Sequence, residues 1–319
     1  MASAEGLRVR AGVRAQRAAT RCAVVSTGEA QDPESQGPEN VKFAVGAPNV
    51  AAFADPGYLV DLAAKAEAAG WDGFFVWDHL LYPSLDGAAV EPWSIIAAAA
   101  AVTSRIRLGV LVTAVPRRRP ALLAQQVTTI DLLSGGRVVF GAGLGSMPEE
   151  YESFGEDGDL AVRARKLDEA LDVMCALWSG ERVTHAGEFF TVNGAVLHPT
   201  PLQRPQIWIG GRWPNRAPFR RAARYDGVMP THAAYSHGSF MTPQELGEIV
   251  TYVERHRTAG GRIAVVMEGE SASAHHLADI APSYTEAGLT WWVEKLGWWR
   301  GDLDAASRRV DAGPPSRRR

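Results

Sequence analysis

Hydrophobic and polar positions follow one repeating scheme from Val41 to about Gly313. A short run of β-branched or aromatic residues leads into a polar or glycine-rich link, and then into a segment with apolar residues at helical spacing. This alternation is typical of parallel strands joined by outer helices. The apolar runs predict eight strands: Phe43–Ala47, Phe74–Trp77, Ile106–Val112, Val138–Gly141, Ile207–Gly210, Gly227–Met229, Ile263–Met267 and Thr290–Val293.

Two of the helical segments have clear boundary signals. Asp55 can cap the first of them, Pro56 takes its first helical position and Gly70 ends it. A second helix begins at Pro120 and is closed by Gly135. The apolar residues that we expect this second helix to bury are Leu123, Val127, Ile130 and Leu133.

Eight such units in about 270 residues predict a (β/α)8 TIM barrel, which usually takes roughly 250 residues. An open doubly wound sheet is the alternative. Residues 182–198 contain two turn signals, Ala186-Gly187 and Asn193-Gly194, and predict a hairpin insertion between strands 4 and 5. We expect this insertion at the C-terminal rim of the barrel. Barrel enzymes carry their chemistry at that rim, so the residues that follow each strand are the functional candidates.

The two ends of the chain differ from this repeating middle. Residues 1–40 contain five arginines and no apolar periodicity, and all their acidic residues except Glu5 lie beyond residue 28. We expect a disordered N-terminal extension there, although a transit peptide and a native start at Val41 are alternatives. The expected division is therefore the extension 1–40, the barrel 41–313 and a disordered tail 314–319.

Composition excludes several classes of protein. A net charge of -3 provides no field that would gather nucleic acid. Apolar stretches such as Ile95–Val102 are much shorter than the roughly 20 residues that span a bilayer. The two cysteines, Cys22 and Cys175, have no spacing for a disulfide framework, and no histidine spacing closes a metal site. We expect a cytoplasmic protein with no nucleic-acid or membrane partner and no bound metal.

The best candidate for proton transfer follows the second strand. Asp78-His79 places a histidine, which exchanges protons near neutral pH, beside a carboxylate that can orient it. The alternative is a histidine that only hydrogen-bonds a loop. His232 follows the sixth strand and is expected to face the same mouth, where a structural role in a polar loop is the simpler interpretation.

Glycines and arginines at the same rim leave room for a ring and an anion. The segment Gly141–Ser146 lets backbone approach a flat ring or a phosphate. Gly210-Gly211-Arg212 precedes a helical segment near Pro214 and is a candidate phosphate cradle. Arg117–Arg119 either holds an anion or forms a solvated face. Several tryptophans are core residues or walls of an apolar pocket for a planar ring: Trp77, Trp93, Trp208, Trp213, Trp291 and Trp292.

The ordered series of motifs resembles the bacterial luciferase-like flavin-dependent oxidoreductase superfamily from about Val41 to about Gly313. The segments that carry the likeness are Asp78-His79, Leu108–Thr113, Pro120–Gln125, Ile130–Arg137, Gly141–Gly145, Glu150–Gly155 and Ile209–Gly211. The resemblance implies a (β/α)8 barrel that binds coenzyme F420 or FMN at its C-terminal mouth. Ser146 departs from the family's sugar-phosphate dehydrogenases, which have a carboxylic acid there. The pocket side also offers almost no lysine, so a phosphorylated sugar is not expected.

The resemblance also implies roles for individual residues. His79 would be the catalytic proton donor or acceptor. The cofactor ring would lie against the backbone after strand 3, where relatives have a non-prolyl cis peptide. The implied cofactor-binding residues lie at or after the ends of strands 2, 3, 4 and 5: Asp78, Leu111, Val112, Thr113, Gly143, Gly145, Gly210, Gly211 and Arg212.

Three functions fit this resemblance. The Asp-His pair is more similar to the F420-dependent branch, so we expect hydride transfer between coenzyme F420 and a small organic substrate. The first alternative is a monooxygenase, in which a separate flavin reductase supplies reduced FMN and an apolar mouth shields the reaction with oxygen. The second is a non-catalytic flavin-binding protein. A homodimer is expected because dimers are usual among relatives.

Overall fold

Eight parallel strands close into a barrel. The computed structural model describes residues 41–82, 88–234 and 240–315, so the expected N-terminal extension lies outside the described residues, as does most of the expected tail. Around the barrel the strands follow the order β1-β10-β9-β8-β7-β4-β3-β2. All eight predicted strands and the TIM barrel are confirmed. The barrel strands are β1 (Lys42–Ala47), β2 (Gly73–Val76), β3 (Arg107–Ala114), β4 (Val138–Gly143), β7 (Gln206–Trp213), β8 (Gly227–His232), β9 (Ala264–Gly269) and β10 (Trp291–Lys295).

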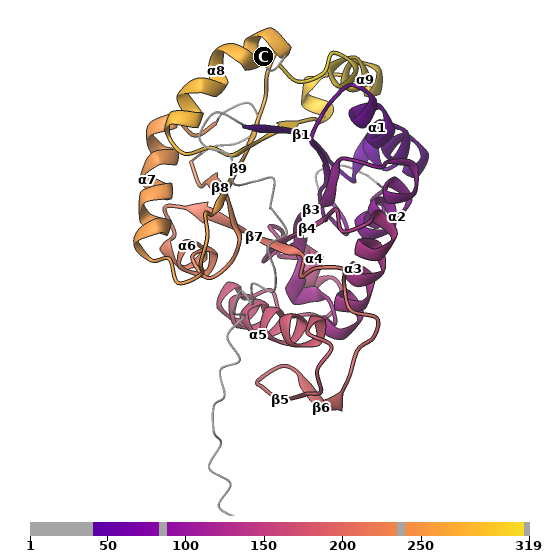
Figure 1. Cartoon of the computed structure of the whole chain (residues 1–319), viewed down its shortest axis with the longest axis vertical. Helices are drawn as coiled ribbons and strands as arrows, with labels where there is room; N and C mark the ends of the chain where they lie inside the picture. The colour runs from indigo at the N-terminus through magenta and orange to yellow at the C-terminus, as the bar shows by residue number, and fades with distance from the viewer. Residues whose placement is uncertain (1–40, 83–87, 235–239, 316–319) are drawn as a thin grey trace, which may run out of the picture.

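Helices surround the barrel on its outside, as Figure 1 shows. The helices of the described ranges are α1 (Pro56–Ala68), α2 (Pro92–Val102), α3 (Pro120–Ser134), α4 (Glu149–Glu152), α5 (Leu160–Trp178), α6 (Arg216–Ala222), α7 (Pro243–Arg255), α8 (Ala274–Glu286) and α9 (Leu303–Asp311). The predicted cap of α1 is present, since the Tyr58 N–H donates to Asp55 Oδ1 at 3.0 Å. Among the described residues, no helix is both long and apolar enough to cross a membrane.

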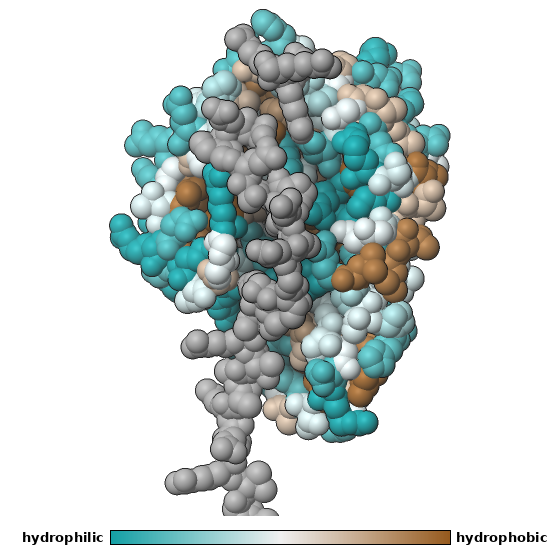
Figure 2. All heavy atoms as spheres, viewed as in Figure 1, coloured by the Kyte–Doolittle hydropathy of each residue, from teal (hydrophilic) through white to brown (hydrophobic). Residues whose placement is uncertain are grey.

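The predicted buried face of α3 needs one correction. Leu123, Val127 and Ile130 are buried, but Leu133 is 57% exposed. At about 100° per residue, Leu133 lies about 80° away from Leu123 around the helix, whereas Ser134 lies only about 20° away and is buried in its place. In Figure 2 hydrophobic residues gather along the right-hand edge, on the side where Figure 1 places α2 and α3.

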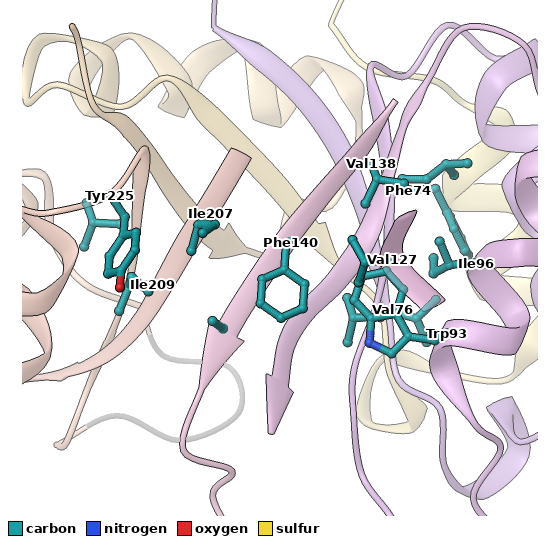
Figure 3. Packing of buried hydrophobic residues seen from close by; sticks show 14 of the residues in the cluster. Phe74, Val76, Trp93, Ile96, Val127, Val138, Phe140, Ile207, Ile209 and Tyr225 are labelled. Atoms are coloured by element: carbon teal, nitrogen blue, oxygen red, sulfur yellow. The ribbon is translucent and has the colours of Figure 1, made fainter. Parts of the chain in front are cut away.

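Two apolar layers hold the barrel together. The outer layer lies between strands and helices, and Figure 3 shows part of it, including Phe74 of β2, Phe140 of β4 and Val127 of α3. The inner layer fills the barrel itself and takes at least one residue from each strand: Ala44, Phe75, Leu111, Val139, Trp208, Met229, Val266, Trp291 and Val293. Because side chains alternate along a strand, the residues two positions after this inner layer point into the C-terminal mouth.

The chain between α5 and β7 forms a two-stranded antiparallel sheet of β5 (Val183–Ala186) and β6 (Thr191–Ala195). The expectation that this segment sits at the C-terminal rim is wrong. Helix α5 has already returned the chain to the other end of the barrel before β5 begins, and β5 and β6 lie on the outer side of α5 (Figure 1). Glu169 of α5 accepts the backbone N–H groups of Phe189 and Phe190 at 3.0 and 2.7 Å and so fixes the connecting turn.

Candidate active site at the mouth of the barrel

A buried asparagine after β1 fixes the backbone of His79. The Asn49 Nδ2 donates to the carbonyl oxygens of His79 and Val90, both at 2.7 Å, and its Oδ1 accepts the His79 N–H at 3.0 Å. Asn49 is completely buried. Since one side chain binds both backbone groups of His79, only the side-chain torsions of the histidine remain to be set.

The His79 ring is oriented by Glu150 of α4. The His79 Nδ1 lies 3.3 Å from Glu150 Oε1, and the same oxygen accepts the backbone N–H groups of Leu80 and Leu81. Burial acts to raise the pKa of Glu150, but the His79 hydrogen bond and the Arg117 charge outweigh it and hold that pKa below its ordinary value. An ionised carboxylate only accepts, so His79 carries its proton on Nδ1. The other ring nitrogen, Nε2, has no hydrogen-bond partner in the described part of the chain.

Asp78 binds two arginines and does not contact the His79 ring. Its Oδ1 accepts from Arg117 Nη2 at 2.8 Å and from Arg118 Nη2 at 2.9 Å, and its Oδ2 accepts the Ala114 N–H at 2.9 Å. Burial acts to raise the pKa of this carboxyl, but the charges of Arg118 and Arg117 outweigh it, so the pKa lies below its usual value. Arg117 also reaches Glu150, with Nη1 3.1 Å from Oε2. The two carboxylates are therefore joined through one guanidinium.

Arg117 and Arg118 neither hold an anion nor form a solvated face, which were the two interpretations of Arg117–Arg119. The side chains of Arg117 and Arg118 are only 6% and 18% exposed, so they are not a solvated face. They are paired with internal carboxylates, Arg118 also with Glu91 at 3.1 Å, so they are not free to hold an anion. The sequence pattern could not reveal this, because the partners come from β2, α4 and the start of α2.

The backbone of β3 bulges into the mouth at Val112. The Leu111–Val112 peptide bond is cis, as the resemblance implies, and the pairing of β3 with β4 shifts between Val110 and Thr113. Val112 is partly exposed at the mouth. Thr113 is completely buried, and its Oγ1 has no hydrogen-bond partner among the described residues.

Two glycines give Val112 its space. A Cβ at Gly143 would lie 2.4 Å from Val112 Cγ2, and a Cβ at Gly210 would lie 3.0 Å from Val112 Cγ1. Any side chain at Gly143 therefore displaces Val112, and one at Gly210 presses against it. Along β3, β4 and β7 the wall of the mouth therefore consists of the Val112 side chain and of backbone.

Tyr151 and Arg163 hold the loop after β4 in place through hydrogen bonds to its backbone. Gly145 has a φ of +74°, and a Cβ there would lie 2.9 Å from the Tyr151 hydroxyl. That hydroxyl donates to the Leu144 carbonyl at 2.6 Å, and Arg163 donates to the Leu144 and Gly145 carbonyls at 3.3 Å. Farther round the barrel, Gly211 packs against α6, and Arg212 is exposed.

His232 does not face the mouth, contrary to expectation. Met229 of β8 belongs to the inner layer, so Thr231 points inward and His232 points outward. Its Nε2 lies 3.9 Å from Glu245 Oε1 of α7. No group of three or more His, Cys, Asp or Glu residues within the described ranges could hold a metal ion.

The structure thus brings His79, Asp78 and the β3 bulge to one region, with Gly143 and Gly210 against the bulge. Two residues of this site have no role in the sequence analysis. Asn49 directly follows the first strand, so the rule that selected strand-end residues would have included it. Glu150 is 71 residues from its partner His79, and no spacing could have paired them.

Comparison with known proteins gives consistent matches. Residues 24–275 match the family model described as luciferase-like monooxygenase. An uncharacterized protein of Mycobacterium tuberculosis is 32% identical over 228 residues, which are 66% of this chain and 75% of that protein. An F420-dependent glucose-6-phosphate dehydrogenase of Microbacterium testaceum is 34% identical over 163 residues, but only 50% of this chain and 48% of that enzyme are covered. Among solved structures, an F420-dependent secondary alcohol dehydrogenase in complex with an F420-acetone adduct superimposes with a TM-score of 0.70 at 18% identity, covering 86% of this chain and 99% of that one.

Proposed function

The chain belongs to the luciferase-like monooxygenase family, and from this membership we propose that it transfers a hydride between coenzyme F420 and a small organic substrate, with His79 giving or taking the accompanying proton. The names of similar dehydrogenases favour F420 over FMN. The observation that carries the proposal is the His79–Glu150 pair, because it prepares one ring nitrogen for proton exchange at the mouth.

The residues at the mouth fit a flat tricyclic ring. Val112 offers an apolar surface, and Gly143 and Gly210 beside it leave room for that valine without adding side chains of their own. Exposed Arg212, near the end of β7, is available to the phosphate of the cofactor. F420, when bound, supplies the carbon that accepts or gives the hydride.

The proton is handled by His79. With Nδ1–H held by Glu150, Nε2 can take the proton of a substrate hydroxyl as a carbonyl forms, and can return it in the reverse direction. The buried carboxylate of Glu150 stabilises the imidazolium that results, as the carboxylate of a catalytic triad does. General acid–base catalysis of this kind contributes about 10²- to 10⁴-fold in rate.

Asp78 supports this site without touching the reacting atoms. Its carboxylate is saturated by Arg117, Arg118 and the Ala114 amide. It therefore acts as a positioning residue, which fixes the β2 end against the start of the loop after β3. Arg117 transmits the same constraint to Glu150.

The test begins with binding and proceeds to turnover. Purified protein is titrated with F420 and separately with FMN, followed by cofactor fluorescence, and F420 reduction is then measured without oxygen on a panel of alcohols. We expect His79→Ala to retain F420 affinity within a few-fold and to lose about 10²- to 10⁴-fold in turnover. His232→Ala, on the outer side of β8, is the matched control and keeps normal turnover.

Two results would contradict the proposal. Binding of FMN but not F420, together with oxygen uptake in the presence of a flavin reductase, would establish the monooxygenase alternative. Unchanged turnover in a His79→Ala enzyme that still binds F420 would remove the role of His79. The expected homodimer stays a prediction, which light scattering of the purified protein tests.

A further inference from the structure

The mouth has a second wall, built by β2, β9 and β10. On these strands the positions two residues after the inner apolar layer are Trp77, Glu268 and Lys295. The facing position on β1 is Gly46, where a Cβ would lie 3.7 Å from Glu268 Oε1. This wall contrasts with the glycine-rich wall around Val112, because it presents an indole, a carboxylate and an ammonium.

The side chains of this second wall form a compact cluster. The Trp77 Nε1 donates to Glu268 Oε1 at 3.0 Å, and Lys295 Nζ lies 3.6 Å from Glu268 Oε2. The ammonium also lies over two indoles, 5.2 Å from the Trp77 centroid and 5.5 Å from that of Trp299. The two indole planes are nearly parallel, at 14°. Glu270 accepts the Trp299 Nε1–H at 2.7 Å and keeps that ring in place.

Lys295 Nζ and Glu268 Oε2, at the centre of this cluster, can each form further hydrogen bonds. The side chains of Lys295 and Glu268 are only 19% and 12% exposed. Within the part of the chain that the structure describes, the three N–H donors of Lys295 make no hydrogen bond, since 3.6 Å to Glu268 is too long. Glu268 Oε2 likewise accepts none. A mostly desolvated ammonium without a hydrogen bond, beside a carboxylate oxygen that accepts none, is unfavourable, and a ligand oxygen would satisfy both.

The cluster adjoins the proposed proton-transfer site. The Trp77 ring contacts the His79 ring edge to face, with centroids 5.9 Å apart, while its own face carries Lys295. His79 and the Glu268–Lys295 pair therefore contact the same indole. A substrate several carbons long can reach both.

We propose that Glu268 and Lys295 bind a second oxygen function of the substrate, and that the substrate is a neutral polyhydroxylated compound. This inference rests on the proposed function. Lys295 donates to the hydroxyl oxygen, Glu268 Oε2 accepts its proton, and the indole faces cover the adjoining C–H groups. The pair has no net charge, and the carboxylates of Glu268 and Glu270 repel a phosphate. A neutral polyol thus fits where a phosphorylated sugar does not.

The experiment compares substrates with and without the second hydroxyl. Linear alcohols of four to eight carbons and the corresponding terminal diols are assayed for F420 reduction, as are glucose and glucose 6-phosphate. At one chain length we expect kcat/KM of the wild type for the diol to exceed that for the mono-alcohol by about tenfold, the worth of one hydrogen bond. We expect Lys295→Met and Glu268→Gln to abolish that preference mainly through KM, and Lys65→Met, exposed on α1, to preserve it.

Direct binding separates this inference from the proposed function. Titration of the cofactor-free protein with 1,6-hexanediol or sorbitol changes the indole fluorescence of the wild type and not that of Lys295→Met, whether or not any alcohol reduces F420. Absence of F420 turnover with this fluorescence change intact overturns only the proposed function. Equal kcat/KM for alcohol and diol, an equal loss for both in Lys295→Met, or a preference for glucose 6-phosphate overturns the subsite.

Discussion

The substitution Asp78→Asn tests whether this carboxylate is a structural anchor of the mouth. The wild-type side chain accepts four hydrogen bonds, two from Arg117 and Arg118 on Oδ1 and two from Ala114 and Arg118 on Oδ2. Asparagine keeps one acceptor and turns an N–H₂ group toward the other two donors. Its neutral side chain also leaves the two buried guanidinium groups without that charge.

The structure sets the expected size of the effect. Removing one partner of a buried ion pair costs about 3 to 5 kcal/mol. Arg117 keeps Glu150 and Arg118 keeps Glu91, so we expect the lower end, about 3 kcal/mol. For a domain of this size each kcal/mol lowers Tm by about 2 to 4 °C, which gives a decrease of roughly 6 to 12 °C.

Thermal unfolding followed by circular dichroism at pH 7 measures this loss, with Asp61→Asn on the exposed face of α1 as the control. Because the pKa of Asp78 lies below its ordinary value, its contribution is complete above an ordinary aspartate pKa of about 3.9 and is lost as the pH falls through the lower folded value. The difference between wild type and variant should therefore be the same at pH 7 and pH 5. A Tm within 2 °C of both the wild type and the control at pH 7 would refute the reasoning.

Three further predictions follow from other contacts. Glu150→Gln should lower turnover by about 10- to 100-fold. Because Glu150 acts through His79, the double variant should lose little more turnover than His79→Ala alone. Additive losses in this double-mutant cycle would show that the two residues act independently. Gly143→Ala should displace Val112 and weaken F420 binding by about tenfold or more, whereas Gly247→Ala in α7, where a Cβ would make only an ordinary contact with Ala287 at 3.9 Å, should bind normally. Glu67 has its pKa lowered to about 2, since hydrogen bonds from the Ile106, Arg105 and Ser104 amides outweigh its partial burial. Glu67→Gln should thus cost about 1 to 2 kcal/mol in urea unfolding at pH 7, less than the full shift because the side chain is partly in water, and nothing near pH 2.

The barrel was predictable because its signals are local. Each strand is a short apolar run, and each of the two marked helices has a proline at its start, so neither needs knowledge of distant residues. The predicted ends of the last two strands were less accurate. We expected them to stop at Met267 and Val293, whereas β9 and β10 continue to Gly269 and Lys295. The charged residues Glu268 and Lys295 interrupt the apolar pattern at the point where the strands enter the mouth.

The chemistry of the site was less readable, because it depends on pairs that are distant in sequence. Asp78 stands beside His79 in the chain and was the natural carboxylate to orient it, but alternation along the backbone sends the two side chains to different partners. The carboxylate that contacts the ring belongs to a four-residue helix after β4. The contact between His79 and Glu150 depends on where β2 and β4 lie in the barrel. No spacing in the sequence encodes that placement.

The hydrogen bonds by which Asn49 holds the backbone of His79 have a consequence for how the protein becomes active during synthesis. Asn49 follows β1, and β1 is completed as a barrel strand only when it pairs with β10, from Lys42 with Trp291 to Gly46 with Lys295. A nascent chain still lacking its final strand therefore has an unsupported Asn49, and the histidine that depends on it is not held. Catalytic competence on the ribosome should therefore appear late and abruptly, once β10 has emerged.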